Sequence, residues 1–226
     1  MIRRLFPCLM ILSISCCLLK AQEVDSAVFN MPKSQSLEWL IAPSVLIVSG
    51  IALNGNGPES IKNEIVEWRN ETIPNFHTHA DDYLQYAPIV IAYGLDVFGC
   101  KSKNDFINKS VILVKGELVT SVVVYGLKNV THQLRPDLSA YNSFPSGHTA
   151  QAFAGAVFLS EEYKDKIKWM PYLAYGIASS VGLLRMANNR HYISDVLVGA
   201  GVGMLSMKLA YVTHKYKWGK RRANNE

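Results

Sequence analysis

Residues 185–212 read RMANNRHYISDVLVGAGVGMLSMKLAYV. A polar start is followed by an apolar run from about 192 to 212, and a run of this length without strand alternation predicts a helix. His191 and Asp195 stand four residues apart, so they share one face if the helix has begun by His191. A carboxylate in that place can accept the Nδ1 proton and leave Nε2 basic, ready for nucleophilic attack. The ordinary alternative is a histidine at a helix start with an aspartate in the first turn.

Further apolar segments precede this one, separated by short polar connections, at about 84–99, 111–127, 147–159 and 169–187. No strand alternation and no internal repeat competes with this pattern, so the sequence predicts an all-α fold. An earlier apolar run, from Trp39 to Leu53, is interrupted by Pro43 and predicts a helix that stops at the turn 54–58. Residues 61–68 predict an amphipathic helix.

Lysine and arginine gather at three places, at 101–109, 164–168 and 215–222. These clusters lie at alternate ends of the apolar segments, as the positive-inside rule expects of helices that cross a membrane back and forth. We therefore predict spans from residue 84 onward, with 128–148 and 185–195 on the same non-cytoplasmic side. A soluble bundle stays open as an alternative, because several segments are short and because Lys115 and Glu117 are costly in lipid unless they face the bundle interior.

The N-terminus has Arg3 and Arg4 before an apolar run from Leu5 to Leu19, which predicts a secretory signal peptide over 1–21. An uncleaved anchor is the alternative, although the run is short for a full span. Cleavage would leave Cys100 alone among the four cysteines and exclude a cysteine metal cluster. The net charge of +5 is small and unevenly placed, and the sequence shows no single basic face with aromatic or Gly-rich recognition elements, which argues against a nucleic-acid partner.

Two more clusters carry chemistry. Phe144-Pro145-Ser146-Gly147-His148 opens an apolar segment, with Ser146 near the N-cap, and the free N–H groups of such a first turn form a phosphate cradle. Lys128 and Arg135 flank a polar connection that Pro136 stiffens. Each cluster alone also fits a plain helix cap or a solvated loop, but Arg185 and Arg190 beside the prepared histidine favour a bound oxyanion.

The three clusters together resemble the signature motifs of the type 2 phosphatidic acid phosphatase (PAP2) superfamily, which also includes bacterial nonspecific acid phosphatases and vanadium haloperoxidases. The similarity covers about residues 84–213. It implies a membrane-embedded all-α helical bundle of this type and a phosphatase that works through a phosphohistidine, with no metal or other cofactor. One departure is Leu184, which stands where the family usually has serine.

The resemblance also implies a role for each matching residue. The phosphate oxygens would be bound by Lys128, Arg135, Ser146, Gly147 and Arg185. The catalytic residues would be His191, which attacks phosphorus, Asp195, which orients it, and His148, which protonates the leaving oxygen.

We expect four parts along the chain: a signal peptide (1–21), an N-terminal periplasmic segment with one or two helices (22–83), the PAP2 catalytic bundle (84–213) and a basic tail (214–226). The expected substrate is a membrane lipid phosphate at the periplasmic face of a bacterial inner membrane. Lipid A is favoured over undecaprenyl pyrophosphate and phosphatidic acid, by similarity to small signal-bearing homologues. The alternatives are a soluble periplasmic acid phosphatase for small phosphomonoesters, a vanadium haloperoxidase and a non-enzymatic scaffold. The oligomeric state is not predicted.

The stretch FHTHADDY, residues 76–83, supplies one more candidate set: His77, His79, Asp81 and Asp82. Their spacing could bind a divalent metal. The more ordinary interpretation is a polar loop in which Asp81 and Asp82 start the next helix. By the predicted topology this loop lies on the active-site side and helps to shape substrate entry.

Overall fold

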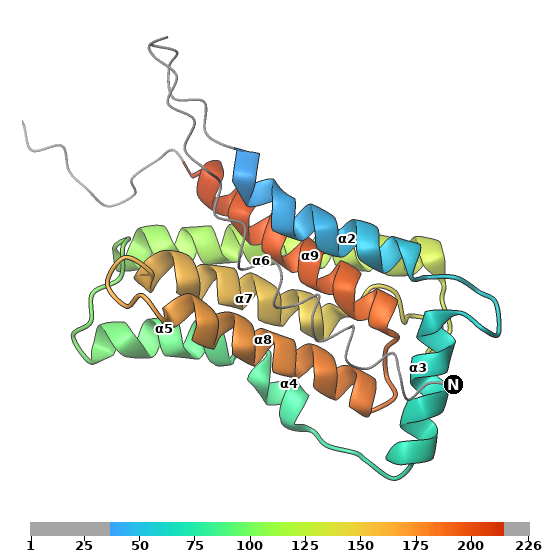
Figure 1. The fold of residues 1–226 in the computed structure, drawn as a ribbon. Coiled ribbons are helices and arrows are strands. Elements are labelled where there is room, and N and C mark those ends of the chain that lie inside the picture. Colours follow the sequence, from blue (N-terminus) through green and yellow to red (C-terminus); the bar gives the residue numbers. More distant parts are fainter. Residues whose placement is uncertain (1–36, 215–226) are drawn as a thin grey trace, which may run out of the picture. The chain divides into compact units, whose positions relative to one another are not determined.

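The computed structural model describes residues 37–214, and these form helices, turns and loops without a strand (Figure 1). The elements in chain order are a short 3-10 helix, Leu37–Leu40, followed by α2 (Ile41–Ala52), α3 (Ile61–Thr72), α4 (Ala80–Leu84), α5 (Ala87–Val97), α6 (Phe106–Thr131), α7 (Gly147–Tyr163), α8 (Met170–Ala187) and α9 (Ile193–Val212). The predicted all-α fold is confirmed. The predicted signal peptide at 1–21 lies outside the described residues, as does the predicted basic tail beyond residue 214.

The helix ends differ from the predicted ones where local capping decides. Pro43 does not interrupt α2, because it is the third residue of the helix, and a proline in the first turn removes no intrahelical hydrogen bond. Helix α6 begins earlier than predicted, because the Asp105 side chain caps it by accepting a hydrogen bond from the Asn108 backbone N–H at 2.9 Å.

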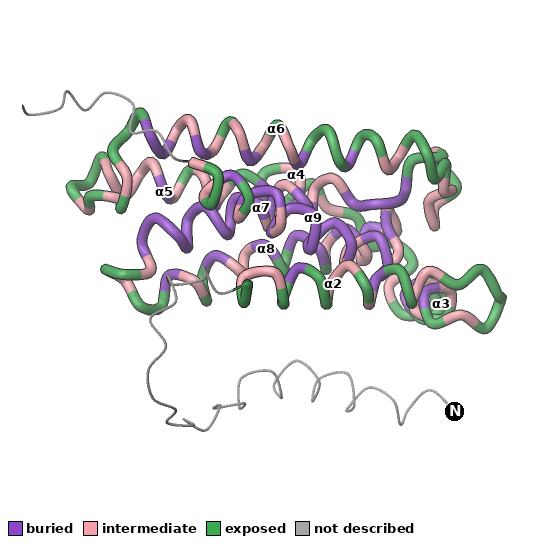
Figure 2. The backbone as a smooth tube through the Cα atoms, turned by 90° about the horizontal axis from the view of Figure 1, so that it is seen from above, coloured by how far each residue is buried: buried purple, intermediate pink, exposed green. Residues whose placement is uncertain are grey.

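The buried centre of the bundle is made by α7 and α9 (Figure 2). Helix α7 packs against α5, α8 and α9, while α9 also contacts α2 and α6. Two glycines of α9 allow its backbone to lie directly against the backbone of α7. A Cβ on Gly199 would lie 2.5 Å from the carbonyl oxygen of Ser146, and one on Gly203 would lie 2.1 Å from that of Ala150. Because only glycine fits at such distances, these positions bring the first half of α9 against the start of α7.

Gly203→Ala is expected to destabilise the bundle by about 3 kcal/mol, because the new methyl group would push α9 away from α7. Unfolding of the detergent-purified protein by heat or denaturant would measure the loss. The matched control is Gly176→Ala in α8, where nothing lies within 4 Å of the added Cβ, and where alanine should stabilise by up to about 1 kcal/mol. Equal stability of the two variants would mean that the α7–α9 contact is not tight.

Two of the predicted spans, α6 and α9, are long and apolar enough to cross a membrane. Helix α9 is mostly buried among its neighbours, whereas α6 presents an exposed apolar stripe to the outside: Val114, Leu118, Val122 and Tyr125. Glu117 of α6 turns inward toward Gln151 of α7, and one of its carboxylate oxygens is buried. Glu117 therefore faces the bundle interior and not the lipid, as an acidic residue in a membrane-spanning helix must. The full number of spans stays a prediction.

Candidate functional site

A polar cavity of about 260 Å³ brings residues from all three sequence clusters together. Arg135 comes from the loop after α6, His148 from the first turn of α7 and Arg185 from the last turn of α8. The full lining consists of His77, Thr78, His79, Asp82, Arg135, His148, Arg185, Asn188 and Arg190. The predicted convergence of the clusters on one place is therefore present for these three side chains, while their roles stay predictions.

Two of the arginines keep an unpaired donor. Arg185 is 6% exposed, and its Nη1 donates to Asp81 Oδ2 at 2.6 Å, but its Nε has no hydrogen-bond partner among residues 37–214. Arg135 likewise has a buried Nε without a partner in this part of the chain. A buried donor left unpaired is costly, so both groups suit an anion that would accept from them.

The start of α7 is tied directly to α9. The buried Ser146 caps α7, because its Oγ accepts from Thr149 N–H at 3.5 Å and lies 2.9 Å from Thr149 Oγ1. Its own backbone N–H donates to the carbonyl oxygen of Asp195 at 3.0 Å. The hydroxyl of Ser146 therefore has partners within the protein, and its contact with phosphate stays a prediction.

His191 and Asp195 form the predicted pair, although α9 begins only at Ile193. His191 is 2% exposed, and its Nδ1 lies 3.4 Å from Asp195 Oδ2. Asp195 is fully buried and also accepts hydrogen bonds from the Ser143 hydroxyl and from the Tyr192 backbone N–H, the latter at 3.0 Å. An aspartate in the first helical turn can thus reach a histidine that precedes the helix.

Burial lowers the pKa of His191 to about 4, and the positive charges of Arg185 and Lys128 act in the same direction, whereas Asp195 opposes them. The imidazole is therefore neutral near pH 7. The same interactions place His191, Arg185 and Lys128 within one electrostatic cluster. A neutral, oriented imidazole beside two cations has the form that a nucleophile toward an anionic phosphate needs.

Lys128 lies in the last turn of α6, where its Nζ donates to the carbonyl oxygen of Asn142. Its Cε lies 4.0 Å from the point where a Cβ on Gly147 would stand, so this lysine borders the start of α7. Lys128, Ser146, Gly147, His191 and Asp195 are not in the wall of the polar cavity. His191 lines a separate, apolar cavity instead.

Two residues in the site were not predicted to touch the motifs. Asp81 binds Arg185, and Asp82 Oδ1 lies 2.9 Å from Nε2 of His148. Asn188 holds this segment in place: its Nδ2 donates to the carbonyl oxygen of Thr78 at 2.8 Å and to Asp81 Oδ1 at 3.0 Å. The sequence feature that pointed to these residues was the polar stretch HTHADD, but its spacing did not indicate which distant residues it contacts.

The interpretation of HTHADD as a loop that leads into a helix is confirmed, since α4 spans Ala80–Leu84. Across residues 37–214, no group of three or more histidine, cysteine, aspartate or glutamate side chains could hold a metal ion. The metal alternative for this stretch therefore has no ligand set in the described structure.

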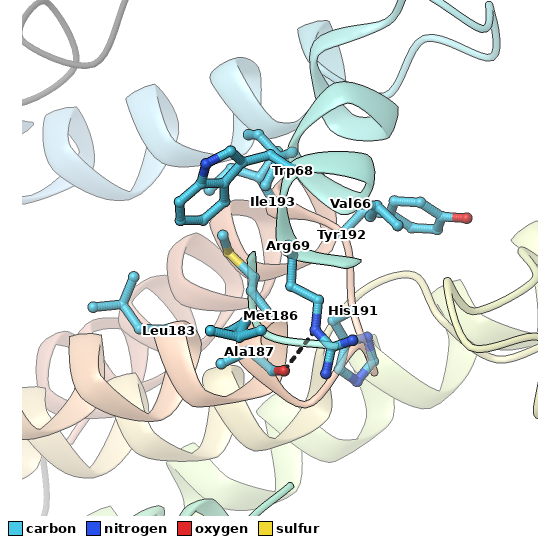
Figure 3. A pocket seen from close by; sticks show the side chains of 11 residues that line it. Val66, Trp68, Arg69, Leu183, Met186, Ala187, His191, Tyr192 and Ile193 are labelled. Carbon is cyan, nitrogen blue, oxygen red and sulfur yellow. Dashed lines mark hydrogen bonds between the residues drawn. The ribbon is translucent and has the colours of Figure 1, made fainter. Parts of the chain in front are cut away.

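A second cavity, of about 240 Å³, is largely apolar and lies between α3 and the junction of α8 with α9 (Figure 3). Its lining consists of Ile65, Val66, Trp68, Arg69, Ile73, Leu183, Met186, Ala187, His191, Tyr192 and Ile193. Arg69 fastens α3 to this junction, because its Nε donates to the carbonyl oxygen of Ala187 at 2.9 Å. His191 thus stands at the border between an apolar cavity and the cationic cluster.

Comparison with known proteins identifies the family. The model of the PAP2 superfamily matches residues 109–219, which contain every residue predicted to bind phosphate or to act in catalysis. The chain belongs to the PAP2 superfamily. The predicted resemblance is therefore confirmed, and so is the fold class that it implied.

Several proteins of known description resemble this PAP2 chain. Lipid A 1-phosphatase from Porphyromonas gingivalis is 37% identical over 153 residues, covering 67% of this chain and 34% of that protein. Phosphatidylglycerophosphatase B from Bacillus subtilis is 29% identical over 151 residues, covering 61% of this chain and 71% of that protein. The chain spans about a third of the length of the first curated relatives that it matches, at 34%, 31% and 30%.

The crystal structure of a transmembrane PAP2-type phosphatidylglycerolphosphate phosphatase from Bacillus subtilis shares the fold. The TM-score is 0.56 at 20% sequence identity, and the match covers 76% of this chain and 94% of that one. The match extends beyond the residues of the family model and supports the helical bundle as a whole.

Proposed function

We propose that this PAP2 protein is a lipid phosphatase that cleaves a phosphate ester through a phosphohistidine. The observation that carries the proposal is a buried, neutral His191, oriented by Asp195, next to a buried Arg185 whose Nε has no partner in the described structure. A neutral histidine surrounded by positively charged side chains is suited to attack phosphorus as a nucleophile. It is not suited to bind phosphate as a positive charge.

The reaction runs in two steps. Nε2 of His191 attacks phosphorus while the bond from phosphorus to the leaving oxygen breaks, and His148 gives its proton to that oxygen. Water then attacks the phosphohistidine, His148 accepts a proton from this water, and the phosphorus–nitrogen bond breaks to release inorganic phosphate. Asp195 keeps the proton of His191 on Nδ1 throughout, so that Nε2 carries the lone pair.

Charge dispersal supplies most of the catalysis in this scheme. Phosphoryl transfer spreads negative charge over three equatorial oxygens, which preorganised cations and N–H groups stabilise. Arg135, Arg185 and Lys128 provide the cations, and the first turn of α7 provides N–H groups at the positive end of a helix dipole. This chemistry has no step that requires a metal ion, so activity is expected to survive EDTA.

Three features support a lipid rather than a small soluble substrate. The apolar cavity reaches His191 itself, and a hydrocarbon chain is the kind of group that such a lining binds. Helix α6 exposes an apolar stripe of the kind that faces lipid. The relatives named above are phosphatases of lipids, and the lipid A 1-phosphatase makes a lipid A phosphate our first candidate. We place the site at the periplasmic face of a bacterial inner membrane, following the distribution of basic residues.

The test compares phosphate release by detergent-purified protein, with EDTA present, from lipid A, undecaprenyl pyrophosphate, phosphatidic acid and p-nitrophenyl phosphate. We expect turnover of a lipid phosphate and little release from p-nitrophenyl phosphate. Preferred turnover of p-nitrophenyl phosphate would favour the soluble acid phosphatase, and no release from any substrate would refute the phosphatase proposal.

Trp68→Ala is expected to lower kcat/KM for the preferred lipid about tenfold, because the side chain forms part of the apolar cavity, and two buried methylene groups of a lipid chain contribute about that much. The rate with p-nitrophenyl phosphate should stay the same. The control is Trp169→Ala, an exposed tryptophan just before α8, which should affect neither substrate. A parallel loss on both substrates in Trp68→Ala would count against the cavity as a lipid site.

A further inference from the structure

The segment that precedes the PAP2 core brings two carboxylates to residues of the polar cavity: Asp81 pairs with Arg185, and Asp82 lines the cavity beside His148. Asp81 and Asp82 open α4, which lies well before residue 109, where the match to the family model begins. Asp81 is fully buried and paired with Arg185, whereas the side chain of Asp82 is 44% exposed at the cavity. Two anionic groups in a site built for an anion need an explanation, because they should repel the substrate.

Asp82 differs from Asp81 in its partner. Its Oδ1 lies 2.9 Å from Nε2 of His148, and its Oδ2 lies 3.2 Å from Nδ1 of His79. A carboxylate that bridges two imidazoles in this way favours their protonated forms, because each bond then becomes a charge-assisted one. The contact therefore fixes the ring of His148 and supports the charge that a general acid must carry.

Resting on the proposed function, we infer that Asp82 is a positioning residue for the general acid: it orients the ring of His148 toward the leaving oxygen and favours its protonated form. Because Asp82 occupies Nε2, the proton for the leaving oxygen comes from Nδ1, and Nδ1 later accepts the proton of the attacking water. His148 and Asp82 thus form a second histidine–carboxylate pair, beside that of His191 and Asp195. The pair of His148 and Asp82 serves the leaving group, and the pair of His191 and Asp195 serves the nucleophile.

The other charged groups around His148 make this support necessary. Burial lowers the pKa of His148, and the positive charge of Arg185 lowers it further, while Asp82 and, more weakly, Asp81 raise it. His79 meets the far oxygen of Asp82, and Arg190 of the same cavity is paired with Asp137 at 2.9 Å. Even with Asp82 present, the pKa of His148 lies below its ordinary value, so removing this carboxylate would lower the pKa further. Its proton would then be lost at a lower pH.

The experiment is the pH profile of kcat/KM for wild type and Asp82→Asn, with the preferred lipid substrate. A general acid is active below its pKa, so its ionisation sets the alkaline limb of the profile. Losing a charged partner lowers the pKa of His148, and we expect this limb to move to lower pH by about one unit. On the alkaline side the variant should therefore be about tenfold slower, with no rise in KM.

A good leaving group provides a second measurement. Nitrophenolate leaves without a proton, so Asp82→Asn should slow p-nitrophenyl phosphate hydrolysis far less than that of an alkyl phosphate of similar size, even if both rates are low. Because the Asp82 side chain is partly exposed, asparagine should be accommodated without loss of the fold, which thermal unfolding would verify.

The control is Asp137→Asn, which removes a carboxylate near the same cavity that contacts Arg190 and not His148. Its alkaline limb should remain in place. If Asp82→Asn keeps the wild-type limb, or if it binds substrate more tightly and turns it over faster, Asp82 is an occluding anion and the inference is wrong. Turnover by wild type and its loss on replacement of His191 test the phosphatase itself, so the two failures are distinguishable.

Discussion

His191→Ala is expected to abolish phosphate release, with kcat at least about 10⁴-fold below wild type. Among residues 37–214, the imidazole of His191 is the one held by Asp195, whereas His148 is engaged by Asp82. The variant keeps Arg135 and Arg185 of the polar cavity, so lipid binding should be affected much less than turnover. The measurement is the rate of phosphate release under saturating lipid.

The covalent intermediate gives this prediction a second readout. Brief mixing of wild type with a lipid carrying labelled phosphate, followed by denaturation in alkali, should leave label on the protein, because a phosphoramidate resists base and is cleaved by acid. His191→Ala should carry none. The control is His132→Asn, which replaces an exposed histidine at the end of α6 whose φ of 42° asparagine tolerates. Label that persists in His191→Ala would place the nucleophile elsewhere.

Much of the site could be predicted because its residues lie in short segments with strong local rules. Ser146 caps α7 as the sequence indicated, and the cap directs the next residues, including His148, to the start of that helix. The spacing of His191 and Asp195 predicted their contact even though the helix begins two residues later than that reasoning assumed. Sequence spacing is enough to predict a contact when both residues belong to one helical turn or its cap.

Contacts between distant segments could not be predicted in this way. The pairs Asp81–Arg185 and Asp82–His148 join residues separated by 104 and 66 positions. They exist because Asn188 and Arg69 fasten the segment between α3 and α4 onto the end of α8, through hydrogen bonds to backbone carbonyls. A polar residue before the catalytic core can face solvent, cap a helix or contact a distant residue. The periodicity of the sequence does not show which of these contacts the tertiary structure forms.

The apolar cavity is also formed by segments that are distant in the sequence, so it could not be predicted. Helix α3 was predicted to be amphipathic, but the sequence does not say what its apolar face covers. In the structure Ile65 and Trp68 line one cavity together with Leu183 and Met186 of α8 and with His191. Figure 3 shows Trp68, Leu183, Met186 and His191 around it. A helix outside the matched family residues thereby borders the proposed nucleophile. Such an addition can tune substrate choice while the charged machinery stays the same.

Asp195→Asn is expected to lower kcat about 10³- to 10⁴-fold with little change in KM. The carboxylate accepts the Nδ1 proton of His191 and is held by Ser143 and by the backbone N–H of Tyr192. A carboxamide can donate to Nδ1 instead. This would favour the tautomer whose proton is on Nε2, and an imidazole in that form has no lone pair to direct at phosphorus.

The pH dependence separates this explanation from a change in charge. Asp195 raises the pKa of His191, which burial has already lowered to about 4, so its loss can only lower that pKa further. The variant histidine is then neutral at every pH where wild type is active, and raising the pH should restore nothing. Ser143→Ala, which removes one bond to Asp195 but keeps its charge, should cost about tenfold or less. If Asp195→Asn were no worse than Ser143→Ala, the carboxylate would serve the fold of the α7–α9 junction and not the tautomer of the nucleophile.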